Sequence, residues 1–90
     1  MKINVSHILV QHDYEAQDIL RSLQSGKKFE ELARKFSKCP SAEQGGELGT
    51  FGKGRLDPDF EDAAFALKVG QTTEKPVRTR FGYHIIRRNL

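Results

Sequence analysis

The single cysteine and the three histidines of this 90-residue sequence could take part in nucleophilic, acid–base or metal chemistry. Cys39 lies in residues 37–54, a stretch that also holds five of the eight glycines. A run of this length with so little helical or strand pattern is more often a functional loop than a connector. A lone cysteine is usually a small buried hydrophobe, but a place between a helix end and this loop favours a partly exposed thiol. Both interpretations of Cys39 stay open from the residues alone.

Two of the histidines occupy the middle of strand-like segments at opposite ends of the chain. His7 and His84 each stand among apolar neighbours in an alternating pattern. A single histidine in such a place is usually a core residue with a satisfied hydrogen bond, whereas two of them allow a side-by-side pair. His12 follows the first of these segments, and we expect it to be solvated.

These residues allow several kinds of chemistry, but the sequence lacks a motif or residue that each of them requires. A Cys39–histidine hydrolase dyad would need a base within hydrogen-bonding distance and oxyanion donors, and no cysteine-protease signature surrounds Cys39. A zinc site of Cys39, His7 and His84 lacks a closely spaced ligand pair. Residues 49–54 lack the G-K-[ST] ending of a phosphate-binding loop. Basic pairs are scattered along the chain, which is typical of solvated faces rather than of a nucleic-acid site. We expect no metal and no cofactor.

The composition describes one small domain. Ninety residues are too few to give a second domain a core of its own, and the charged residues, 30% of the chain, nearly balance at a net charge of +3. The single cysteine excludes an internal disulfide and suits a reducing compartment. The N-terminal segment lacks the apolar run and cleavage site of a signal peptide, and no stretch approaches the roughly 20 apolar residues of a membrane span. We therefore expect a monomeric domain over residues 1–90 that is soluble and cytoplasmic, unless it is a domain excised from a longer secreted or membrane-anchored parent.

Apolar side chains recur at helical spacing in three segments. Asp13 and Asp57 can act as N-caps, Pro58 suits a first helical position, and glycine follows the first and third segments. The second segment ends ahead of Pro40, because a residue before proline is disfavoured in a helix. The expected helices cover about residues 13–25, 29–36 and 57–69.

Alternating apolar residues predict the strands. Residues 2–11 carry apolar side chains on both faces toward their C-terminal half, which predicts a central strand covered on both sides. Residues 47–51 form a short strand inside the glycine-rich stretch, and residues 74–79 and 83–89 give two more. The order is strand, two helices, strand, helix and two strands, which predicts an α+β domain on a small, mostly antiparallel sheet.

Five short motifs, taken together and in order, resemble the parvulin family of peptidyl-prolyl cis–trans isomerases. They are S-H-I-L-V at residues 6–10, F-S-K-C-P-S at 36–41, G-G-E-L-G-T-F at 45–51, P-D-F-E-D-A-A-F at 58–65 and F-G-Y-H-I-I at 81–86. The resemblance covers residues 2–89. It implies a four-stranded antiparallel sheet with helices on both faces.

The resemblance also implies which residues form the site. His7 and His84 should lie side by side beneath it, Cys39 should face the substrate amide, and Thr79 should join the same hydrogen-bonded network. The proline ring of the substrate should enter an apolar pocket. The residues expected to bind it are Leu48, Leu56, Phe60, Phe81 and Phe51. Leu56 replaces the methionine of many relatives with nearly the same volume, so the pocket should tolerate it.

The implied activity is rotation about X–Pro bonds in extended or partly unfolded polypeptides. The barrier of about 18–20 kcal/mol reflects lost amide resonance, and a dry apolar site complementary to the twisted amide lowers it without covalent chemistry. Attack by the Cys39 thiolate is disfavoured, because family members also carry aspartate there. The phosphate-directed branch inserts a basic loop after the first strand, whereas only Gln11 and His12 precede Asp13 here, so we expect no phosphate requirement. The alternatives are a non-catalytic chaperone or peptide-binding module and, third, a nucleic-acid-binding protein.

Overall fold

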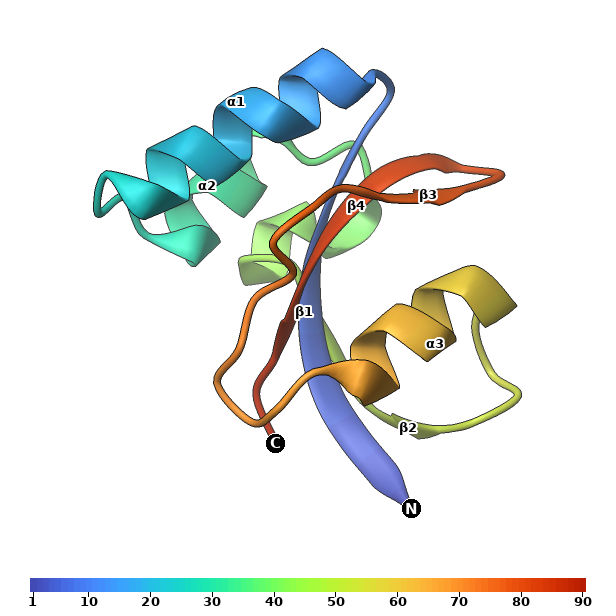
Figure 1. Ribbon diagram of the computed structural model, residues 1–90. Coiled ribbons are helices and arrows are strands. Elements are labelled where there is room, and N and C mark those ends of the chain that lie inside the picture. Colours follow the sequence, from blue (N-terminus) through green and yellow to red (C-terminus); the bar gives the residue numbers. More distant parts are fainter.

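The computed structural model describes all residues from 1 to 90 as one α+β domain (Figure 1). In chain order its elements are β1 (Lys2–Val10), α1 (Asp13–Gln24), α2 (Phe29–Phe36), a 3₁₀ helix η1 (Pro40–Gln44), β2 (Glu47–Gly52), α3 (Pro58–Ala66), β3 (Val77–Thr79) and β4 (Gly82–Arg88). The strands form one antiparallel sheet in the order β2-β1-β4-β3. The predicted fold class is confirmed. No helix combines the length and the apolar character that a membrane crossing would need.

The central strand β1 gives the sheet two different faces. It pairs with β2 on one side and β4 on the other, so its alternate side chains enter two separate cores. Helices α1 and α2 cover one face and α3 covers the other, as Figure 1 shows. The α1/α2 core consists of Ile8, Val10, Ala16, Ile19, Leu20, Phe29, Leu32, Ala33 and Ile85. The α3 core consists of Ile3, Val5, Phe60, Ala64, Leu67 and Ile86.

Two glycines bring the backbone of neighbouring segments close to β1. Gly46 has φ +88°, and a Cβ there would lie 2.4 Å from the carbonyl oxygen of His7. Gly82 has φ +140°, and a Cβ there would lie 2.4 Å from the carbonyl oxygen of Val10. A residue with a side chain would have to shift the strand at either place. The approach at Gly46 lets its carbonyl accept the N–H of His7 at 2.9 Å, which holds the middle of the glycine-rich stretch against the sheet.

Two predicted helix ends are wrong in detail. The N-cap of α1 is His12, not Asp13, and the N–H of His12 donates to the Glu15 carboxylate at 3.1 Å. Helix α3 ends at Ala66, short of the expected end near residue 69, because Leu67 adopts an extended conformation. Its start is as predicted, since Asp57 accepts from the N–H of Asp59.

The loop and edge segments also differ from the expectation. The glycine-rich stretch contains the helix η1, so it is more ordered than its composition indicates. Strand β3 covers only the end of the expected 74–79 segment. Pro76 has no N–H to donate to the sheet. Earlier in the chain, Thr73 contacts β4, because its hydroxyl accepts the N–H of Ile86 at 3.0 Å.

Candidate active site

The two strand histidines lie side by side on the α3 face of the sheet. His7 of β1 and His84 of β4 are each 4% exposed. Because Leu9 pairs with His84 in the antiparallel register, His7 is the diagonal neighbour of His84 on the same face of the sheet. Their Nδ1 atoms are 2.9 Å apart, and their rings stack with centroids 5.1 Å apart.

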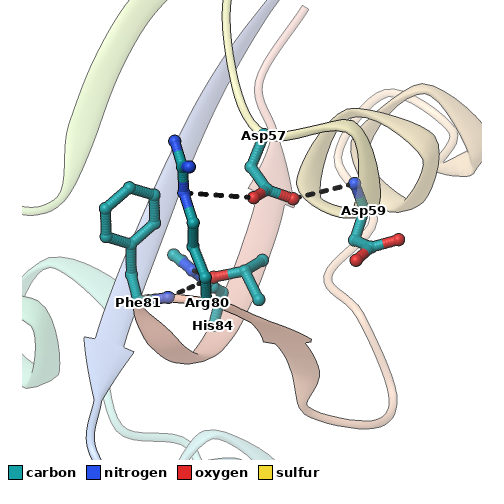
Figure 2. A network of polar contacts seen from close by, with 6 residues as sticks. Asp57, Asp59, Arg80, Phe81 and His84 are labelled. Atoms are coloured by element: carbon teal, nitrogen blue, oxygen red, sulfur yellow. Dashed lines mark hydrogen bonds and ion pairs between the residues drawn. The ribbon is translucent and has the colours of Figure 1, made fainter.

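Thr79 extends this pair into a three-residue network. Its Oγ1 lies 2.7 Å from Nε2 of His84 and also accepts the N–H of Phe81 at 3.1 Å. A hydroxyl can accept and donate at once, so Thr79, His84 and His7 form one continuous hydrogen-bonded chain. The turn between β3 and β4 is thereby tied to the centre of the sheet (Figure 2).

Both histidines of the network are neutral at physiological pH. Burial, and to a smaller extent the neighbouring His84, lowers the pKa of His7 to about 4. Burial also lowers the pKa of His84 to about 4, against the opposing charge of Asp57. The floor of the site is therefore polar but uncharged.

An apolar cavity of about 320 Å³ opens above the histidines. This volume is at the small end of ligand pockets, which suits a compact ring with a short length of backbone. The lining residues are His7, Leu9, Lys38, Cys39, Pro40, Leu48, Leu56, Asp57, Phe60, Phe81 and His84. Phe60 joins the cavity to the polar network, because its ring packs edge-on against His7 and His84 with centroids 5.5 Å and 5.1 Å away.

The structure brings together most of the residues named from the sequence. Seven of them line the cavity: His7, Cys39, Leu48, Leu56, Phe60, Phe81 and His84. Thr79 does not line it and reaches it through His84. Phe51 is not part of the cavity, which corrects its expected role. It pairs with Ile3, four residues before His7 along β1, and packs against Phe65 at a centroid distance of 6.5 Å.

Cys39 is placed at the cavity edge by the backbone around it. The N–H of Lys38 donates to the carbonyl of Leu9 at 2.7 Å, and the Ser37 hydroxyl accepts from the N–H groups of Leu9 and Cys39. The half-buried thiol forms no hydrogen bond with either histidine: both ring nitrogens of His84 are bonded to His7 and Thr79, and Nε2 of His7 has no hydrogen-bond partner within the chain. This arrangement is not that of a cysteine–histidine dyad. No group of three or more histidine, cysteine or acidic side chains is arranged to hold a metal.

Two charged residues at the rim were not expected in the site. Asp57 lines the cavity, with one carboxylate oxygen capping α3 and the other 4.0 Å from Nε of Arg80. The Arg80 guanidinium lies beside the Phe81 ring (Figure 2), at 5.0 Å from the ring centre. The sequence signalled Asp57 as a helix cap, but nothing in it indicated that the cap faces a pocket.

A third missed residue, Glu61, lies just behind the rim. It is 7% exposed, and its carboxylate accepts the backbone N–H groups of Gly54, Arg55 and Leu56. A glutamate in the first turn of a helix suggested only a favourable dipole interaction.

A neutral histidine network beneath an apolar cavity, on a four-stranded antiparallel sheet between helices, defines a parvulin-type peptidyl-prolyl isomerase domain. Comparison with known families agrees, because the family described as the PPIC-type PPIase domain matches residues 7–89. The chain belongs to this family of peptidyl-prolyl cis–trans isomerases, and the predicted resemblance is confirmed.

Individual relatives include both long and short proteins. The chain is 49% identical over 87 residues to the foldase protein PrsA of Geobacillus sp. (strain WCH70), which covers 96% of this chain and 31% of PrsA. The crystal structure of PrsA from Bacillus subtilis superposes with a TM-score of 0.96 at 44% identity, over 99% of this chain and 35% of that one. The solution structure of NmPin, the parvulin of Nitrosopumilus maritimus, gives a TM-score of 0.86 at 49% identity, over 97% of this chain and 94% of NmPin. The chain thus spans about a third of the length of the foldases and nearly all of the small parvulin.

Proposed function

We propose that this site accelerates the cis–trans isomerisation of X–Pro bonds in extended or partly unfolded polypeptides, without a covalent intermediate. The observation that carries the proposal is the apolar cavity set directly on an uncharged histidine network. The twisted amide has lost resonance and is less polar than the planar one, so a dry cavity favours it relative to water. Leu48, Leu56 and Phe60 can hold the proline ring while the adjoining carbonyl rotates.

The non-covalent route is supported by the surroundings of Cys39. A nucleophilic thiol needs a base to take its proton or a positive environment that stabilises the thiolate. Neither histidine is bonded to the thiol, and burial keeps both of them neutral. Cys39 therefore acts as a wall of the cavity beside the substrate amide.

The absence of a phosphate requirement also belongs to the proposal. Only Gln11 and His12 separate β1 from α1, so that connection carries no arginine pair. At the rim, the charge of Arg80 is offset by Asp57, 4.0 Å away. A dianionic phosphoserine before proline should gain little over glutamate there.

We also propose an oligomeric state, a location and a class of partners. The chain acts as a monomer in the cytoplasm, on proline-containing polypeptides, without a nucleic-acid or membrane partner. Three arginines, Arg21, Arg80 and Arg87, face acidic side chains instead of forming a continuous basic surface. Light scattering, cell fractionation and the salt dependence of any nucleic-acid binding test these points.

The experiment is a cis-to-trans assay on X–Pro peptides with the wild type, Cys39→Ala, Cys39→Asp and Phe60→Ala. We expect acceleration that survives Cys39→Asp and falls with Phe60→Ala. Equal rates for pSer–Pro and Glu–Pro peptides are expected. A large gain on the phosphopeptide would overturn the phosphate part, and loss of activity in Cys39→Asp would overturn the non-covalent part.

A peptide-binding module without catalysis is the second candidate. The observation that favours it is the exposed apolar rim, since Phe81 is 54% and Leu56 37% exposed. A wild type that accelerates no peptide, yet binds unfolded proline-containing chains, would establish this candidate instead.

A further inference from the structure

One wall of the cavity is formed by a loop with little packing of its own. Residues 53–56 connect β2 to α3 and end in Leu56, which lines the cavity and is 37% exposed. At Gly54 the backbone has φ +92°, and nothing lies within 4 Å of the position a Cβ would take. All four residues are exposed, so contact with the core contributes little to the conformation of the loop.

A single carboxylate holds this loop from behind. Oε1 of Glu61 accepts the N–H of Gly54 at 2.9 Å, and Oε2 accepts those of Arg55 at 2.9 Å and Leu56 at 2.7 Å. Three successive backbone N–H groups that converge on one point form an anion-binding nest. Here the anion is supplied by the chain itself, one helical turn beyond the Asp57 cap.

The bond pattern indicates a role beyond support of α3. The N–H of Glu61 makes the ordinary helical bond to the carbonyl of Asp57 at 2.9 Å, so the helix does not need the carboxylate to form its first turn. The carboxylate instead satisfies donors of the loop. Hydrogen bonds from Gly54 and then Leu56 hold the pKa of Glu61 below its ordinary value, as expected for an anion that is bound in this way.

We infer that Glu61 is a positioning residue for the isomerase: its carboxylate fixes the loop 53–56 and so sets the Leu56 wall of the proline cavity. This inference rests on the proposed function. Glu61 touches no substrate and acts through Leu56. Loss of the carboxylate would leave three loop donors without a common acceptor, and the wall would lose its fixed position.

The first test compares Glu61→Gln and Glu61→Ala with Asp62→Asn, a neighbouring exposed carboxylate on the same helix. Glutamine keeps the shape but presents an N–H₂ group to donors, so kcat/KM on X–Pro peptides should fall in both Glu61 variants, by about tenfold in Glu61→Ala. Asp62→Asn should retain wild-type activity. Assays are run at a temperature at which thermal melts show every variant to be folded. Wild-type kcat/KM in folded Glu61→Gln and Glu61→Ala would overturn the inference.

A double-mutant cycle separates positioning from general stability. Leu56→Ala alone should lower kcat/KM, but in the Glu61→Ala background it should lower it much less, because the wall is already displaced. Effects that simply multiply would show that Glu61 does not act through Leu56 and would overturn the inference. Amide exchange gives an independent readout: in Glu61→Ala the protection of Gly54, Arg55 and Leu56 should be lost while that of Ile85 and Ile86 remains.

An added anion tests the nest itself. Formate can occupy the space left in Glu61→Ala, so kcat/KM of that variant should rise with formate but not with chloride at equal ionic strength. The wild type and Asp62→Asn should not respond. No response of Glu61→Ala to formate would count against the nest. A wild type without activity on any peptide would instead refute the proposed function. Amide exchange of residues 53–56 would still report whether the Glu61 carboxylate fixes the loop.

Discussion

The two faces of the sheet are built from the same strands, but one face packs an apolar core and the other carries the histidine network. On the α1/α2 side, Ile8, Val10 and Ile85 enter the larger cluster of apolar side chains. On the α3 side, the alternate positions of the same strands carry His7 and His84 in a hydrogen-bonded network. Strand geometry makes this separation automatic, because successive side chains point to opposite faces.

The difference shows where a domain of this size can place a polar site. Burying two neutral imidazoles is unfavourable where ring nitrogens lack partners; three of the four are hydrogen-bonded, and Nε2 of His7 has no partner within the chain. The α3 core is also smaller than the α1/α2 core. We therefore interpret the α1/α2 face as the main source of stability and the α3 face as the functional one. The variants below test this separation, from the largest expected effect to the smallest.

Matched truncation of one phenylalanine on each face gives the largest effects. Phe60→Ala and Phe29→Ala each remove a nearly fully buried ring, 3% and 4% exposed. Each should lower the free energy of unfolding by about 3–5 kcal/mol. Only Phe60→Ala should also lower kcat/KM per folded molecule, by about a hundredfold, since its ring lines the cavity and contacts both histidines.

Denaturant unfolding and the X–Pro peptide assay, corrected for the folded fraction, give the two quantities. If either alanine variant does not fold, Phe60→Leu and Phe29→Leu provide a milder version of the same pair. Equal losses of activity in the two variants would show that the faces are not functionally separate.

Acid should destabilise the α3 face specifically. The pKa values of His7 and His84 are lowered from 6.5 to about 4 in the folded chain, so the unfolded state binds more protons between these values. Stability is therefore fully present above pH 6.5 and falls as the pH drops toward about 4. The slope should reach as much as about 1.4 kcal/mol per pH unit for each histidine.

Urea unfolding across this pH range measures the slope. His84→Gln should flatten it, because one of the two titrating groups is removed. The His84→Gln variant will be less stable at neutral pH, so the comparison concerns the slope and not the absolute value. A wild-type stability that stays constant through this range would contradict neutral burial of the pair.

The fold was largely predictable from the sequence because its signals are local and strong. Short apolar runs around His7 and His84 assign each histidine to a strand, and Asp57-Pro58 marks the start of α3. The contact between the histidines depends on the register of β1 against β4, which alternation alone does not specify. That contact was predictable only from the family resemblance.

The remaining errors have physical causes that are not local. Phe51 has the right residue type for the cavity, but antiparallel pairing with Ile3 places it at the far end of β2. Glu61 looked like any acidic residue in a first helical turn, because convergence of the loop N–H groups depends on the path of residues 53–56. Polar residues that act by binding backbone groups are thus the part of the site that could not be predicted from the sequence.

A pair of buried threonines gives the smallest and most selective test of the two-face comparison. The hydroxyls of Thr79 and Thr73 both accept a backbone N–H, from Phe81 at 3.1 Å and from Ile86 at 3.0 Å. Replacement by valine keeps the shape and should lower the free energy of unfolding by about 1–3 kcal/mol in each case. Only Thr79 also contacts His84, at 2.7 Å, so only Thr79→Val should lower kcat/KM, by about tenfold. Chemical denaturation and the peptide assay measure both variants, and serine at position 79 should restore activity because it returns the hydroxyl. If Thr79→Val stays fully active, the network beneath the cavity serves stability alone, and function on the α3 face is confined to the apolar walls.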